Sequence, residues 1–176
     1  MRESNGPRRL GEALLEEAER RIVGESIPRL RVCLDRLNEE EIWRRRNDET
    51  PSVGNLVLHL CGNGRQWLRA GLLGERDDRN RDAEFDEPGP IPKDELLRRV
   101  DALEETVRGA LLETDPADLL RKRPVQIFDE SGVSILVHVI EHFSYHVGQI
   151  AREVKAGGGG DLGFYDGLEL GGGEKE

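Results

Sequence analysis

The chain has 176 residues, of which 36% are hydrophobic and 35% charged, with a formal net charge of -10. A chain of this length forms one ordinary domain and buries enough surface to fold without disulfides or a structural metal. The negative charge argues against nucleic acid and against an anionic membrane surface as partners, because both would repel the protein.

No stretch approaches the roughly 18 uninterrupted apolar residues of a membrane span, and residues 1–10 lack the apolar core of a secretory signal. We therefore expect a cytoplasmic protein. The two cysteines, Cys33 and Cys61, are too few for a disulfide scaffold, so we expect them to be small buried side chains in a reducing compartment.

The first predicted element is an amphipathic helix over about residues 8–37, where apolar residues recur at helical spacing. Gly24 and Pro28 interrupt it, and proline removes a backbone donor, so a kink or break is expected there. Asn38 and the glutamates after it predict the cap of a short further turn that contains Trp43.

Thr50-Pro51 predicts the start of a second helix that runs to about Leu73. One side of this helix is apolar, and another carries a polar stripe at steps of three and four residues. The stripe either faces solvent or lines a partly buried polar cavity, and it consists of Ser52, Asn55, His59, Asn63 and Gln66.

Residues 74–91 are rich in glycine, proline and charge and show no period, which predicts a long loop. Such a loop is long enough to cross a helical bundle and to join two parallel helices. Its charged residues form either a lid over a site or a solvated run, and they include Arg79, Arg81, Asp82 and Glu84. Pro92 then opens a third helix that ends near Thr114.

The segment after Asp115 predicts one or two helical turns, followed by an irregular or short extended piece up to Gly132. Ser131 is the predicted cap of the last helix, which runs to about Lys155 and is apolar nearly all round, so we expect it at the centre of a bundle. Residues 1–156 then form the domain. Residues 157–176 form a glycine-rich, mostly flexible tail with an apolar island that is able to dock.

The four histidines are concentrated on two of these helices. His142 and His146 are four residues apart and project side by side from consecutive turns, at a separation that one metal ion can bridge. A third ligand must come from a facing element, and His59 is the imidazole best placed to supply it. We therefore predict a three-histidine metal site with open coordination positions, which is typical of a catalytic centre. His138 is further round the helix and suits a supporting or substrate-facing role.

Other residues near the predicted centre support more than one interpretation. Glu141 suits a proton acceptor or an orienting group, but a surface ion pair explains it equally well. Tyr145 suits a donor to an oxyanion, with ordinary packing as the alternative. Gln149 fits either a contact with metal-bound water or a helix–helix hydrogen bond. Cys61 is expected on the far side of its helix from His59 and is not predicted as a ligand.

Several segments resemble the DinB-like (DinB/YfiT) superfamily over about residues 9–166. They are SVGNLVLHLCGN around His59, HVIEHFSYHVGQI through His146, RNRDAEF and LGFYD. The resemblance implies an all-α, up-down-down-up four-helix bundle with a long crossover between its second and third helices. It also implies a metal triad of His59, His142 and His146, filled by zinc, nickel or a similar divalent ion. The superfamily triplet HRG reads HVG at residues 146–148, which puts an anion-binding role there in doubt.

The resemblance implies a metal-dependent enzyme that acts on a small molecule, either as a thiol-dependent S-transferase using a low-molecular-weight thiol or as a hydrolase. It also favours a homodimer. Two other classes remain open: a non-catalytic metal-binding stress or dimeric binding protein, and a purely structural role for hydrogen-bonded histidines. The predicted catalytic residues are Glu141 and Tyr145.

Overall fold

A computed structural model describes residues 6–169, and within that range the chain is mostly helical with a single two-stranded sheet. The predicted all-α class is confirmed in this general form. The elements are α1 (Gly6–Arg21), η1 (Ile22–Ser26), α2 (Ile27–Asp35), α3 (Glu39–Trp43), α4 (Val53–Gly64), η2 (Arg65–Leu72), α5 (Arg81–Asp86), α6 (Lys93–Glu113), η3 (Pro116–Asp118), β1 (Lys122–Val125), β2 (Phe128–Ser131) and α7 (Gly132–Ala156).

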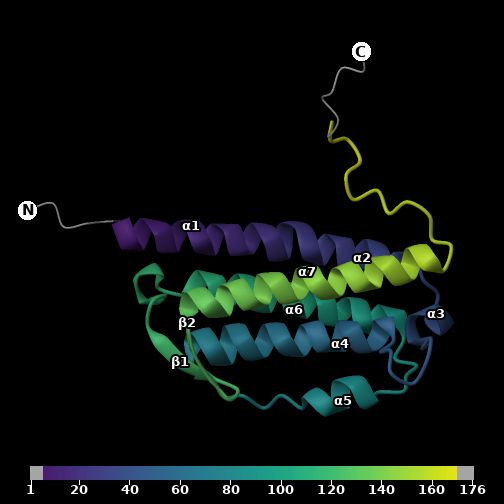
Figure 1. Cartoon of the computed structure of the whole chain (residues 1–176), viewed down its shortest axis with the longest axis horizontal. Coiled ribbons are helices and arrows are strands. Elements are labelled where there is room, and N and C mark those ends of the chain that lie inside the picture. The colour runs from purple at the N-terminus through teal and green to yellow at the C-terminus, as the bar shows by residue number, and fades with distance from the viewer. Residues whose placement is uncertain (1–5, 170–176) are drawn as a thin grey trace, which may run out of the picture.

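Four long helical segments lie side by side: α1–η1–α2, α4–η2, α6 and α7 (Figure 1). Contacts at both ends show that α6 runs opposite to α1–α2. Arg8 near the start of α1 pairs with Asp115 just after α6, and Lys93 at the start of α6 donates to the Leu37 carbonyl after α2.

The other two segments also run in opposite directions. Arg46, shortly before α4, pairs with Glu153 near the end of α7, while Gly71 of η2 lies against Ile135 near the start of α7.

Cys61 of α4 contacts the Arg99 carbonyl of α6, and Arg69 of η2 pairs with Glu113 at the end of α6. The segment α4–η2 therefore runs parallel to α6, and the stretch between them has to return along the length of the molecule (Figure 1).

The first segment stays helical through the two residues that were expected to interrupt it. Gly24 falls within η1, a π-helical turn in which the Ile27 amide donates to the Ile22 carbonyl, and Pro28 follows in the first turn of α2. A proline in the first turn of a helix needs no amide donor, so the chain stays helical from α1 to α2. The predicted interruption of the regular α-helix is present, as a π-helical turn rather than as a break in the helix.

Side-chain caps set the starts of the helices. Asn38 and Glu41 form the predicted capping box of α3, and Ser131 caps α7 as predicted. The start of α4 differs from the prediction. Ser52 forms a capping box with Asn55, whereas the Thr50 hydroxyl donates to Asn47.

The long loop predicted over residues 74–91 contains regular structure. A short helix, α5, begins after Asn80, whose side chain accepts from the Ala83 amide. The segment before α7, expected to be irregular or a short extended piece, is extended: it forms an antiparallel hairpin of β1 and β2, in which Lys122 pairs with Ser131 and Val125 with Phe128.

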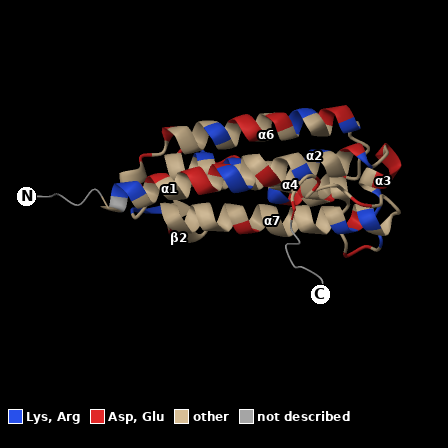
Figure 2. Cartoon of the chain, turned by 90° about the horizontal axis from the view of Figure 1, so that it is seen from above, with Lys and Arg blue, Asp and Glu red and all other residues tan. Residues whose placement is uncertain are grey.

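The core lies between the long segments, and Phe143 of α7 is among its largest fully buried side chains. The expectation that α7 lies at the centre of the bundle holds for only part of its surface, because Val137 and Tyr145 are 42% and 63% exposed. Charged residues are dense along α1, α2 and α6 and sparse along α7 (Figure 2). No helix in residues 6–169 combines the length and apolarity needed to cross a membrane.

The first part of the predicted tail returns to the helices. Leu162 is buried, and the Arg29 guanidinium of α2 lies 5.5 Å from the centre of the Phe164 ring and 5.4 Å from that of Tyr165. The apolar island therefore docks on α2. Residues 170–176 of the predicted tail lie outside the described residues.

Candidate metal centre

The structure brings together the three histidines that the sequence singled out. His59 projects from the middle of α4, and His142 and His146 project from consecutive turns of α7. One ring nitrogen of each lies within 4.8 Å of the others, and His59 Nε2 is 2.9 Å from His142 Nε2.

The donor set fits a divalent metal ion. With metal–nitrogen bonds of about 2.0–2.1 Å, two nitrogens on a tetrahedral zinc lie about 3.3 Å apart, so the three imidazoles need only small side-chain movements to meet one ion. Three protein ligands of this kind leave a further position for water or substrate. A hydrogen bond between His59 and His142 alone would not explain why His146 lies in the same group, so the arrangement favours one ion shared by all three.

A buried carboxylate holds the second nitrogen of His59. Glu84 Oε2 lies 2.9 Å from His59 Nδ1, and the two side chains are 11% and 5% exposed. A carboxylate only accepts hydrogen bonds, so this contact places a proton on Nδ1 and leaves the Nε2 lone pair free for a metal. Burial acts to raise the pKa of Glu84, but hydrogen bonds from Arg79 and His59 outweigh it, and the pKa is lowered.

His146 is oriented in a similar way from its own helix. Its Nδ1 lies 2.7 Å from Gln149 Oε1, and Gln149 Nε2 donates to the Tyr145 hydroxyl at 3.3 Å. The amide oxygen of Gln149 accepts only, so His146 donates from Nδ1 and has its Nε2 lone pair free. The structure gives Gln149 partners on its own helix rather than a helix–helix bond, and it orients a neighbouring imidazole. Contact with metal-bound water stays a prediction.

Burial keeps the histidines of α7 neutral. It lowers the pKa of His142 to about 3, with a further contribution from the neighbouring imidazoles, and it also lowers the pKa of His138 and His146. Metal ligation requires neutral imidazole, so His142 and His146 are in the protonation state that a metal ion needs at neutral pH.

His138 belongs to a separate group one turn closer to the start of α7. Its ring stacks on Trp67, and its Nε2 lies 3.3 Å from Asn63 Nδ2. Within the described residues, Asn63 Oδ1 and Trp67 Nε1 are buried and have no hydrogen-bond partner. The structure thus assigns His138 to the supporting position that its place on the helix predicts.

The polar stripe of α4 is buried along its whole length, which decides between the two interpretations left open by the sequence. The side chains become partners of the loop and of α7, and they are Ser52, Asn55, His59, Asn63 and Gln66. Asn55 Nδ2 donates to the carbonyls of Glu84 and Glu87, each at 2.9 Å. The stripe therefore anchors the loop against α4.

The charged residues of the loop divide into two groups. Arg79 and Glu84 are buried against α4, whereas Arg81 lies over the ring of Phe85 and Asp82 is exposed. The sequence marked Arg79 and Glu84 only as candidate lid residues. Their direct contact with His59 was not predicted, and the RNRDAEF segment by itself contains no signal for it.

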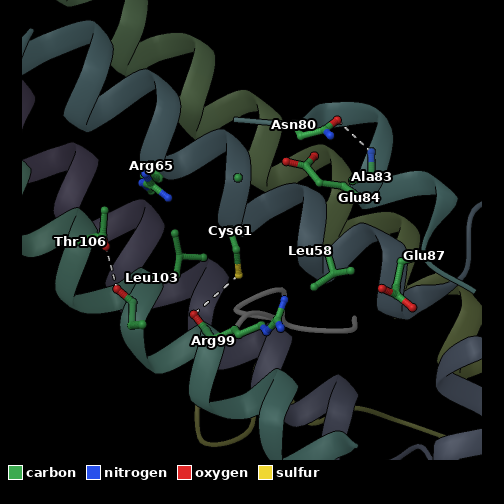
Figure 3. Close-up of a pocket in the computed structure, with 12 residues that line it drawn as sticks. Leu58, Cys61, Arg65, Asn80, Ala83, Glu84, Glu87, Arg99, Leu103 and Thr106 are labelled. Atoms are coloured by element: carbon green, nitrogen blue, oxygen red, sulfur yellow. Dashed lines mark hydrogen bonds between the residues drawn. The ribbon is translucent and has the colours of Figure 1, made fainter. Parts of the chain in front are cut away.

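Of the two predicted catalytic residues, Tyr145 contacts the centre: its ring packs edge-on against that of His146, with centroids 4.9 Å apart. Glu141 is exposed, and its catalytic role stays a prediction. Cys61 lies away from the histidines, as expected, in the wall of a cavity of about 500 Å³ between α4, α5 and α6 (Figure 3). Burial raises the pKa of its thiol to about 12.

Comparison with known proteins adds a family assignment. Residues 12–157 match the model of a family described as Protein of unknown function (DUF1572). No curated protein and no solved structure matches the chain. The family match covers both histidine helices and the loop between them, so the chain belongs to the DUF1572 family.

Proposed function

We propose that this protein is a metal-dependent enzyme that holds one divalent ion, zinc or nickel, with His59, His142 and His146. The observation that carries the proposal is the convergence of three imidazoles, whose ring nitrogens lie within 4.8 Å of one another. Hydrogen bonds that Glu84 and Gln149 accept from the two Nδ1 atoms support it, because they hold the free lone pairs of His59 and His146 in one orientation.

We further propose that the four long segments form a bundle of the DinB/YfiT type. The directions of these segments and the residues of the triad both agree with the resemblance described above. The same resemblance makes transfer of a low-molecular-weight thiol to a small molecule the leading reaction, and hydrolysis the second.

A divalent ion on three imidazoles lowers the pKa of a bound thiol or water and so supplies a nucleophile near neutral pH. The residues of the chain would do the rest. His59 and His146 would each present the Nε2 lone pair to the ion. Tyr145 and Glu141 lie on the exposed side of α7, where a substrate would meet them. A phenol there donates to a developing oxyanion, and a carboxylate accepts a proton.

Elemental analysis of the untagged protein after dialysis against a weak chelator tests the centre. We expect about one equivalent of a first-row divalent ion in the wild type, and none in His59→Ala or His142→Ala at matched concentration. Both variants should remain helical by circular dichroism, because the core does not depend on the histidines. A wild type that stays empty after reloading would overturn the proposal.

Activity is tested separately, with the metal-loaded protein and a panel of thiols and activated esters. Turnover that disappears in His142→Ala supports the enzyme. If the metal binds stoichiometrically and neither thiol transfer nor hydrolysis is detected, the catalytic part of the proposal fails, and the centre is structural or sensory.

A further inference from the structure

The loop between η2 and α6 supplies a buried ion pair, Arg79–Glu84, that contacts Nδ1 of His59. We propose that Glu84 is a positioning residue of the metal centre: it fixes the tautomer and orientation of His59, while Arg79 and Gly62 hold Glu84 in place. This inference rests on the proposed function, since it assigns a role to the loop at the same site.

The first step is the proton on His59. Its Nδ1 lies 2.9 Å from Glu84 Oε2 and 3.0 Å from Arg79 Nη2. A guanidinium only donates, and Arg79 Nη2 has a nearer acceptor than Nδ1 in Glu84 Oε2, at 2.7 Å. A carboxylate only accepts, so we assign the proton in the contact with Glu84 to Nδ1. His59 Nδ1 and Arg79 Nη2 then both donate to Glu84 Oε2. With the proton held at Nδ1, the Nε2 lone pair points toward His142, as a ligand must.

The second step is the support of the carboxylate itself. Arg79 Nε donates to Glu84 Oε1 at 2.7 Å, and Arg79 Nη2 donates to Oε2 at the same distance. The third arm of the guanidinium, Nη1, donates to Gln66 Oε1 at 2.8 Å. A two-pronged pair of this kind fixes both oxygens of a carboxylate, and burial protects it from solvent screening.

The third step is the space that Glu84 occupies. A Cβ atom built on Gly62 would lie 1.9 Å from Glu84 Oε1 and 2.9 Å from Arg79 Nε. The carboxylate therefore reaches His59 only because position 62, three residues later on α4, has no side chain. Figure 3 shows Glu84 and Asn80 on one side of the cavity, across from Arg99 and Leu103.

The consequence for the metal follows from general chemistry. A carboxylate that accepts the second N–H of a ligating histidine makes the imidazole a better donor and fixes its ring, and loss of such a partner costs about 10- to 100-fold in metal affinity. We expect that range for Glu84→Ala and Glu84→Gln. The glutamine variant keeps the shape, but it loses the charge and turns an amide N–H toward Arg79 or His59.

The experiment measures Zn²⁺ affinity by competition with a chromophoric chelator. It compares the wild type, both Glu84 variants, His142→Ala and the control Asp82→Asn, which changes an exposed carboxylate of the same short helix. The control should bind within about twofold of the wild type, because its carboxylate is exposed. Glu84→Gln provides the answer if Glu84→Ala fails to fold.

Wild-type affinity in Glu84→Gln would overturn the positioning role, whereas retention of zinc by His142→Ala would overturn the three-histidine centre instead. A second readout needs no metal. Long-range proton–nitrogen NMR correlations of the metal-free protein should place the His59 proton on Nδ1, and a proton found on Nε2 would also overturn the inference.

Discussion

The imidazole of His138 stacks on the indole of Trp67, with ring centroids 3.6 Å apart and planes inclined by 19°. The sequence places His138 further round α7 than His146, in a supporting or substrate-facing role. The structure agrees with a position outside the triad, because the grouped ring nitrogens are those of His59, His142 and His146, whereas His138 faces Trp67 and Asn63.

Replacing His138 with Phe should therefore leave the metal content unchanged. Phenylalanine offers no ligand but keeps an aromatic ring against Trp67, so the variant should hold the same equivalent of metal as the wild type in elemental analysis. His142→Ala is the control that should lose it. Metal loss in His138→Phe would add His138 to the ligand set.

His138→Ala should instead lower stability while the metal content stays unchanged. An aromatic pair contributes about 1 kcal/mol beyond the area that it buries. For a chain of this size, that corresponds to a fall in Tm of about 2–4 °C. Thermal unfolding followed by circular dichroism measures the fall, and an unchanged Tm would mean that the stack contributes little.

Gly62→Ala should weaken metal binding although position 62 contacts no ligand in the triad. The added methyl collides with Glu84 Oε1, so the carboxylate has to withdraw from His59. We expect a loss of about 10-fold in Zn²⁺ affinity, the lower end of the range for a lost partner of a ligating histidine.

The matched control is Gly109→Ala in α6, where the new Cβ would meet its nearest neighbours at 3.7 Å. That variant should bind zinc like the wild type and gain up to about 1 kcal/mol, because alanine favours a helix interior over glycine. Equal zinc affinity in both variants would show that Glu84 is not held by the shape of α4.

The triad was predictable from the sequence because its signals are local. His142 and His146 share a face by helical spacing alone, and the stripe that holds His59 follows the same period. The burial of that stripe was not predictable. A solvated row and a buried row have the same pattern, and the difference depends on where the loop packs.

The contact of Glu84 with His59 depends on how the loop packs on α4, because the two residues are 25 positions apart in the chain. Neither residue lies in a local sequence pattern that predicts contact with the other. For η1, Gly24 and Pro28 predicted an irregularity at the right place in the first segment, but not that it takes the form of a π-helical turn.

Both cysteines should react slowly with thiol reagents in the folded protein. Burial raises the pKa of Cys33 to about 11 and that of Cys61 to about 12. Only the thiolate attacks, so at pH 8 the reactive fraction is on the order of 10⁻³ or less for either residue, against about a quarter for a free cysteine. Labelling with a chromogenic disulfide should therefore be at least about 100-fold slower than in the denatured chain, and rapid native labelling would contradict these environments.

Arg29→Ala should release the docked tail segment without affecting the metal centre. The guanidinium lies over the rings of Phe164 and Tyr165, and such contacts contribute about 0.5–1 kcal/mol each at exposed sites. Their loss raises the open population several-fold, so chymotrypsin should cut after these aromatic residues several-fold faster. Arg9→Ala, which removes an exposed arginine of α1, is the control and should be cut at the wild-type rate. Equal rates in the two variants would mean that Leu162, buried against the helices, holds the segment without help from Arg29.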